Sequence, residues 1–272
     1  QPLIDKEQMN LRLDAVEMLC KRSVDRDELR EYLNAIYDLE RLMGKISYKT
    51  ANPRDLIAFR NSLAMLPSIR TLLQDLDSAL LTKIRNNTDT LEDIYHLIDD
   101  AILEEPPISI RDGGMIREGF SDSIDALRNA KRDGKNWLAA LEEEDRERTG
   151  IKNLRIKYNK VFGYYFEVTN SYKDLVPEDY VRKQTLANAE RYTTPRLKEL
   201  EDTILNAEDK LSSLEYDLFC QIRDAIAAEV ERIQRTARAI AKLDVLAALS
   251  YVAERNQYVR PSLNEKGIID IK

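Results

Sequence analysis

The sequence has little of the chemistry that most enzyme active sites use. Its 272 residues include a single histidine, His96, which falls on a predicted helix with no nucleophile at motif spacing. It contains no glycine-rich phosphate loop, and no cysteine or histidine residues stand at metal-ligand spacing. We therefore expect no catalytic site, cofactor or metal within these residues.

Cysteines, aromatic residues and long apolar runs are scarce as well. Cys20 and Cys220 lie far apart, and no signal-peptide pattern opens the sequence, so two reduced thiols in a cytoplasmic protein are expected. No run of about 18 apolar residues occurs, which predicts no membrane span. Aromatic residues make up 7% of the chain and charged residues 33%. This composition favours exposed, elongated helices over a compact β fold.

The net charge of −7 is unevenly distributed. Residues 150–198 hold ten Lys or Arg and five Asp or Glu, a local charge of +5, which leaves −12 on the remainder. A basic segment in an acidic chain predicts one place where a polyanion binds. A solubilising surface on a small sheet explains the same composition equally well.

Helical periodicity dominates the first hundred residues. Asp5 is a predicted N-cap, and Asn52-Pro53 is a predicted start, because proline suits the first turn of a helix. Further helices are predicted over 27–43, 68–85 and 90–104. Residues 106–119 alternate around Gly113-Gly114 and predict an extended segment or a short hairpin.

Two longer helices are predicted on either side of the basic segment. The first covers 121–147 with Trp137 among its inward residues, and Gly150 ends it. The second is a single helix within 196–260, where neither glycine nor proline occurs. About 55 helical residues would span roughly 80 Å. We expect the two helices to form a stalk with the basic segment at its far end.

The basic segment itself has the period of β-strands. Apolar and polar residues alternate over 151–172, and residues 159–163 read as a hairpin tip. A second extended stretch is predicted near 179–187. The tyrosines here could stack on single-stranded bases, but a small core is the favoured interpretation. Cations supply charge to phosphates, and Asn, Gln and Thr donate hydrogen bonds to them. The candidate binding residues are Lys157, Asn159, Lys160, Arg182, Lys183, Gln184, Thr185 and Asn188.

Particular sequence runs in this segment resemble one family. Residues 158–169 read YNKVFGYYFEVT and residues 182–192 read RKQTLANAERY. Both are similar to the clamp segment of the MutS family, the DNA mismatch-recognition ATPases of bacteria. Shorter runs resemble the core and lever regions of that family, namely those at 1–3, 12–16, 37–42, 51–56, 110–114 and 243–246.

The resemblance implies a mainly α fold with a small β insertion. It comprises a helical core body, two long antiparallel lever helices, and an antiparallel β clamp domain at their tip. The implied divisions are a helical core at 1–119, an outgoing lever at 120–149 and a β-rich clamp at 150–194. A returning lever at 195–250 then leads to the end of the core at 251–272. In this family the clamp contacts the sugar-phosphate backbone of duplex DNA without reading bases. Ala187 departs from relatives that often carry a basic residue there.

The same resemblance implies what the rest of such a protein does. ATP and Mg²⁺ would bind a domain that follows Lys272. Mismatch recognition would lie in a domain that precedes Gln1, and a sequence that does not begin with methionine agrees with a piece of a longer protein. The levers would couple nucleotide state to clamp opening. The implied partners are duplex DNA, a second copy of the parent protein and a MutL-type repair partner, in a bacterial cytoplasm and associated with the nucleoid. The alternative is a structural helical arm whose basic tip docks an acidic protein.

Overall fold

The computed structural model describes residues 3–265, 267–268 and 271, and the chain divides into two compact units. The first unit comprises Gln1–Ile110 with Phe219–Lys272, and the second comprises Arg111–Leu218. The sequence run at Gln1-Pro2 and part of the predicted 251–272 segment lie outside the described residues. No helix in the described part is both long and apolar enough to cross a membrane.

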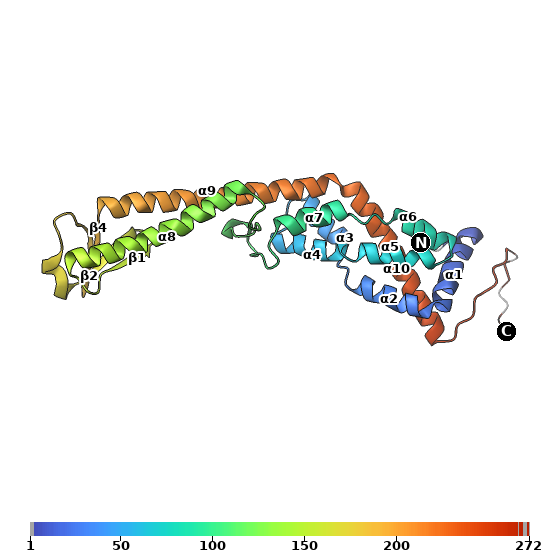
Figure 1. Cartoon of the computed structure of the whole chain (residues 1–272). Coiled ribbons are helices and arrows are strands. Elements are labelled where there is room, and N and C mark those ends of the chain that lie inside the picture. The colour runs from blue at the N-terminus through green and yellow to red at the C-terminus, as the bar shows by residue number, and fades with distance from the viewer. Residues whose placement is uncertain (1–2, 266, 269–270, 272) are drawn as a thin grey trace. The chain divides into compact units, whose positions relative to one another are not determined.

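The first unit consists of helices packed around one central helix. Leu19, Leu29, Phe59, Ile98 and Leu243 are among its buried residues. The central helix, α10, packs against α1, α2, α3 and α6 (Figure 1). The helices are α1 Lys6–Lys21, α2 Ser23–Asn34, α3 Leu39–Ser47, α4 Pro53–Leu63, α5 Leu66–Leu72, α6 Ala79–Asn87, α7 Glu92–Ala101 and α10 Val230–Arg255, with the 3₁₀ turn η1 Leu73–Asp75.

Local capping signals place the ends of several helices where the sequence predicts them. The Asp5 carboxylate accepts a hydrogen bond from the Glu7 amide at 2.8 Å and starts α1. Asn52 and Asp55 form a reciprocal capping box, with Pro53 as the first residue of α4. In each case the side chain satisfies amides that the first helical turn leaves free.

Two of the predicted helices are wrong as single elements. The helix predicted over 27–43 ends with α2 at Asn34, and α3 restarts after Asp38, whose carboxylate accepts from the Arg41 amide at 2.9 Å. The helix predicted over 68–85 is interrupted between α5 and α6, where Leu76 is extended. Pro67 lies in the first turn of α5 instead of before it.

The prediction of one helix over 196–260 is also wrong. The structure has α9 Pro195–Ala228 and then α10, with the break at Glu229. The Glu229 amide donates to the Ile226 carbonyl, three residues back instead of four. Arg232, one turn into α10, contacts the carboxylates of Asp89 and Asp93 at about 3 Å as well as Glu229. Contacts from a distant segment thus accompany a break that no glycine or proline marks.

The second unit is centred on an antiparallel pair of helices. They are α8 Asp122–Thr149 and residues 195–218 of α9, which run side by side in Figure 1. Lys131 pairs with Glu208 at 2.9 Å and Glu144 with Arg196 at 2.8 Å, so one helix ascends as the other descends. Gly134 allows close packing, because a Cβ there would lie 2.5 Å from the Ile204 side chain. Gly150 ends α8 in the left-handed conformation, as predicted.

A four-stranded antiparallel sheet lies between these helices in sequence. Its strands are β1 Arg155–Asn159, β2 Gly163–Thr169, β3 Val181–Thr185 and β4 Ala189–Thr193, in the order β1-β2-β4-β3. The 3₁₀ turn η3 Asn170–Leu175 follows β2. The hairpin and the second extended stretch are confirmed, whereas β4 was not predicted. The mainly α fold with a small antiparallel insertion is therefore confirmed.

The segment before α8 folds differently from its prediction. Residues 106–119 do not form a hairpin, and Ile110–Asp112 is instead a 3₁₀ turn, η2. Gly113 and Gly114 both have positive φ, and the Gly114 amide donates to the Glu215 carboxylate of α9. Glu215 is fully buried and also pairs with Arg128 of α8 at 2.5 Å. The glycines therefore wrap the chain around a buried charge.

Candidate nucleic-acid interface

The inner face of the sheet packs on the two helices of the second unit. Its buried cluster takes Phe166, Val168 and Tyr192 from the strands, Leu138 and Leu141 from α8, and Leu197 and Ile204 from α9. Trp137, predicted to face inward, is instead 49% exposed. Tyr192 belongs to this cluster and Tyr164 packs against it, as the core interpretation predicts. Tyr158 is half exposed, and Tyr165 is buried beneath Arg191 on the other face of the sheet.

Carboxylates of α8 and α9 hold the sheet on the two helices by accepting hydrogen bonds from it. Glu142 of α8 accepts from the Ile156 amide at 2.8 Å and thereby occupies part of the free edge of β1. Asp145 of α8, which is buried, accepts from the Tyr180 hydroxyl at 3.0 Å. Burial and this carboxylate raise the pKa of Tyr180 well above its usual range. Glu201 of α9 accepts from the Tyr164 amide at 3.2 Å. The sheet thus has a defined position on its helices.

The outer face carries a row of polar residues across the strands. Lys157 pairs with Glu167 at 2.7 Å. On the next strands the Arg191 guanidinium donates to the side-chain oxygen of Gln184 at 2.7 Å and lies 4.4 Å from the centre of the Tyr165 ring. The four strands therefore present cations and an amide on one surface.

The loop between β1 and β2 carries two predicted site residues. The Asn159 side-chain oxygen accepts from the amides of Val161 and Phe162, so it shapes the loop. Lys160 is exposed. Lys183, from β3, reaches the same loop and donates to the Phe162 carbonyl at 2.9 Å. The structure thus brings Lys183, from the second predicted cluster, to the loop that carries Asn159 and Lys160.

The remaining predicted residues line the β3 edge and its turn. Arg182 is 58% exposed and stands 3.5 Å from Glu190. Thr185 and Asn188 are exposed, and the Asn188 carbonyl accepts from the Asn170 amide. Thr185 and Asn188 lie at the opposite end of the sheet from the β1–β2 loop. Thr185 pairs with Glu190 near the start of β4, whereas the loop precedes the end of β2 that lies beside the last residues of β4. The predicted site is therefore a band along the sheet.

The net charge of residues 150–198 is larger than the positive charge available on the surface for binding a polyanion, because several of the cations form ion pairs with nearby carboxylates. Arg155 pairs with Glu142 at 2.8 Å and Arg196 with Glu144, both carboxylates of α8 lying outside the basic segment. Lys198 pairs with Glu201 and Asp202 of α9. The helices thus offset part of the +5, and the cations on the sheet and its loops carry the rest.

Glu190 is an important residue that sequence reasoning missed. It is buried, and it accepts from Lys173 at 2.8 Å and from the Tyr192 hydroxyl. The hydrogen bond from Lys173 lowers the pKa of Glu190, while burial and Glu190 itself raise the pKa of Tyr192 to about 12. The only sequence signal was an acidic residue within a basic segment.

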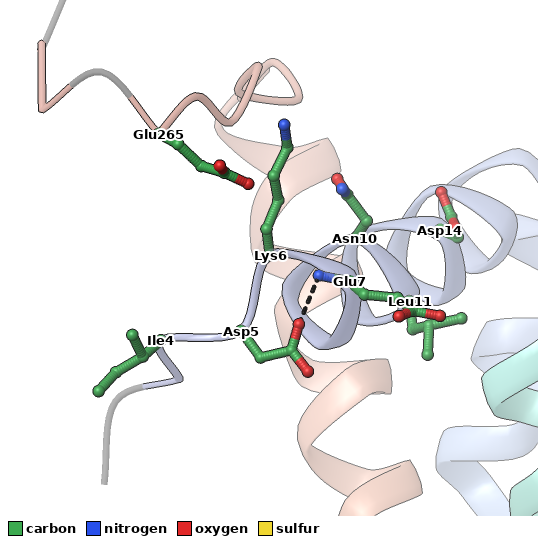
Figure 2. Close-up of a pocket in the computed structure, with 8 residues that line it drawn as sticks. All are labelled: Ile4, Asp5, Lys6, Glu7, Asn10, Leu11, Asp14 and Glu265. Atoms are coloured by element: carbon green, nitrogen blue, oxygen red, sulfur yellow. Dashed lines mark hydrogen bonds between the residues drawn. The ribbon is translucent and has the colours of Figure 1, made fainter.

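Features elsewhere in the described residues do not suit a polyanion. A pocket of about 690 Å³ in the first unit is lined mainly by charged side chains (Figure 2). Its lining residues are the carboxylates Asp5, Glu7, Asp14 and Glu265, the cation Lys6, and Ile4, Asn10 and Leu11. No cluster of described His, Cys, Asp and Glu side chains could hold a metal ion. His96 is exposed on α7, and Cys20 and Cys220 are free thiols.

Known proteins of one family match this chain along its length. The family described as MutS domain III matches residues 1–250. The chain belongs to the MutS family. A protein of Lachnoclostridium phytofermentans named DNA mismatch repair protein MutS is 64% identical over 272 residues, and those of Alkaliphilus oremlandii and Acetivibrio thermocellus, with the same name, are 53% and 50% identical. Each covers the whole chain.

Membership of the MutS family confirms the resemblance that the sequence runs indicated. The chain spans 29% of the Lachnoclostridium protein and 31% of the other two MutS relatives. The match to MutS domain III extends from residue 1 to residue 250, and so includes all of the second unit, the whole sheet and most of the first unit. The candidate interface therefore lies inside the region that carries the family assignment.

Proposed function

We propose that this chain is the core, lever and clamp region of a DNA mismatch repair ATPase, and that its sheet binds the sugar-phosphate backbone of duplex DNA without sequence specificity. The observation that carries the proposal is a set of exposed side chains on the sheet of an acidic chain. Lys160, Thr185 and Asn188 are exposed, and their side chains have no partner among the described residues. Their ammonium, hydroxyl and amide groups all donate to phosphate oxygens.

Two paired cations of the sheet can join them. The Lys157 and Arg182 side chains are each more than half exposed, and each pairs with a single protein carboxylate, Glu167 and Glu190 respectively. In both pairs water reaches the cation and screens the interaction, so a phosphate can share the cation with its carboxylate partner. With Asn159, Lys183 and Gln184 they complete the proposed binding surface.

The other parts of the proposal follow from the family and from the names of the relatives. The helices α8 and α9 would act as levers that couple nucleotide state to the clamp. ATP and Mg²⁺ would bind elsewhere in the parent protein, and the described residues would do no catalysis. The proposed partners are duplex DNA, a second copy of the parent and a MutL-type protein, in a bacterial cytoplasm with the nucleoid.

Binding to duplex DNA is expected to be weak, independent of sequence and strongly dependent on salt. About four phosphate contacts would give a slope of roughly −3 to −4 for log K against log salt. Fluorescence anisotropy with labelled duplexes of different sequence, titrated from low to moderate salt, measures both quantities. Equal affinity at all salt concentrations would contradict the proposal.

The matched control is a labelled polyglutamate of equal charge. Phosphate recognition predicts that the chain prefers the duplex at the same ionic strength, because the Asn, Gln and Thr donors suit phosphate oxygens. A preference for polyglutamate would instead support the interaction-arm alternative.

A further inference from the structure

The loop between β1 and β2, residues 159–163, is held in one shape from within. The Asn159 side-chain oxygen accepts from the Val161 amide at 2.8 Å and from the Phe162 amide at 3.3 Å. Gly163 closes the loop with φ +72°, a conformation that glycine adopts without strain. Asn159 and Gly163 are paired across the hairpin. The side chain of Asn159 is therefore already engaged by the loop's own amides.

Helix α9 holds the loop from one side. Glu201 is buried, accepts from the Tyr164 amide at 3.2 Å and pairs with Lys198 at the same distance. The approach is close, since a Cβ at Gly163 would lie 2.1 Å from a Glu201 carboxylate oxygen. A buried carboxylate that receives a backbone amide and a lysine fixes the base of the loop on the helix.

Strand β3 holds the loop from another side. The register of β3 against β4 shifts between Arg182 and Gln184, so Lys183 occupies a bulge. Bulges redirect a side chain out of the regular alternation. The half-buried Lys183 donates to the Phe162 carbonyl at 2.9 Å. Its ammonium group is thus committed to the loop instead of projecting into solvent.

Two side chains remain at the apex of this braced loop. Lys160 is exposed, and Val161 is 82% exposed although its own amide is bonded to Asn159. A cation next to an apolar group matches the alternation of phosphate and deoxyribose along a DNA strand. Because the loop is ordered beforehand, binding would lose little conformational entropy.

We propose that the 159–163 loop is a preformed contact for one DNA strand, in which Lys160 binds a phosphate and Val161 packs on the adjacent deoxyribose. Asn159, Lys183 and Glu201 are positioning residues that hold the loop and do not contact DNA. This rests on the proposed function and divides its binding surface into contacts and supports. Val161 is added as a contact and Glu201 as a support, and Asn159 and Lys183 become supports instead of contacts.

The salt slope of duplex binding separates the two roles. Lys160→Gln is expected to weaken binding and to reduce the slope by about 1, because one phosphate contact is lost. Lys183→Gln is expected to weaken binding severalfold with an unchanged slope. Val161→Ser should also weaken binding without changing the slope. Lys135→Gln, an exposed lysine of α8, is the matched control and should change neither quantity.

Hydrogen exchange of the loop amides supplies a second readout. Lys183→Gln and Glu201→Ala should speed exchange at residues 161–164, whereas Lys160→Gln and Val161→Ser should not. Glu201→Gln keeps an acceptor for the Tyr164 amide and should restore both slow exchange and binding. Circular dichroism establishes whether each variant is folded. If Glu201→Ala is unfolded, Lys183→Gln alone tests the role of the supporting residues.

The outcomes distinguish this proposal from the one on which it rests. If the unaltered chain shows no salt-dependent binding to duplex DNA, the proposed function and the loop contact both fail. If the chain binds but Lys183→Gln lowers the slope as Lys160→Gln does, with loop exchange unchanged, Lys183 is a phosphate contact. The proposed function then stands and the division of roles is overturned.

Discussion

Replacing Lys160 and Lys183 together with glutamate is expected to weaken binding to duplex DNA by about tenfold or more. The change places two carboxylates at the loop and alters its charge by four units. Lys183→Glu also removes the donor to the Phe162 carbonyl. Because contacts to the backbone carry no sequence information, matched and mismatched duplexes should lose affinity equally. Anisotropy titrations with both duplexes at one salt concentration measure this.

The control makes the same charge change away from the sheet. Lys135 and Lys210 are exposed on α8 and α9, and their replacement by glutamate should reduce affinity far less. An equal loss in the control would show that net charge alone governs binding. A loss confined to mismatched duplexes would contradict contact through the backbone.

Glu215→Ala is expected to have the largest effect on stability in the second unit. The substitution removes the partner of Arg128 and the acceptor of the Gly114 amide, and both groups are at least partly buried. Removing one member of a buried pair costs about 3–5 kcal/mol. Because the Arg128 side chain remains 25% exposed, water can solvate it partly, and we expect about 3 kcal/mol. Urea unfolding followed by fluorescence of Trp137, the single tryptophan, reports on this unit.

Glu208→Ala is the matched control for Glu215→Ala on the same helix. Glu208 pairs with Lys131, and both side chains are 36% exposed, so the loss should stay below about 1 kcal/mol. If the two substitutions cost the same, Glu215 does not organise the 113–116 segment as its contacts indicate.

Local signals made part of the fold predictable. The Asp5 cap, the Asn52-Pro53 start and the end of α8 at Gly150 each depend on one or two neighbouring residues. The first hairpin was predictable because apolar alternation and Gly163 agree on the same turn. The runs at 158–169 and 182–192 identified the family, and with it the presence of the sheet.

The features that the sequence concealed depend on distant partners. The break at Glu229 has no glycine or proline, and Arg232 is bound there to a segment about 140 positions away. Strand β4 begins Ala189-Glu190-Arg191, residues that do not favour strands, and burial of Glu190 depends on Lys173 and Tyr192. Periodicity indicates which face of a helix or strand is apolar, but it does not indicate which charged residues from distant segments will contact that element.

The candidate site was predictable as a set of residues but not as an arrangement. Lys160 and Lys183 lie 23 positions apart, and no pattern in the sequence indicates that Lys183 occupies a bulge and braces the loop before Gly163. Glu201 could not be found from sequence, because its role depends on the close approach of α9 to a glycine.

We propose that the sheet with its loops, and no other part of the chain, lies against duplex DNA. Amide hydrogen exchange measured on the chain with and without a saturating duplex tests it most directly. We expect slower exchange at residues 159–163 and 181–188 when DNA is bound, with no change in α10 at 243–250. Unchanged exchange across the sheet, with slower exchange confined to the helices of the first unit, would contradict it.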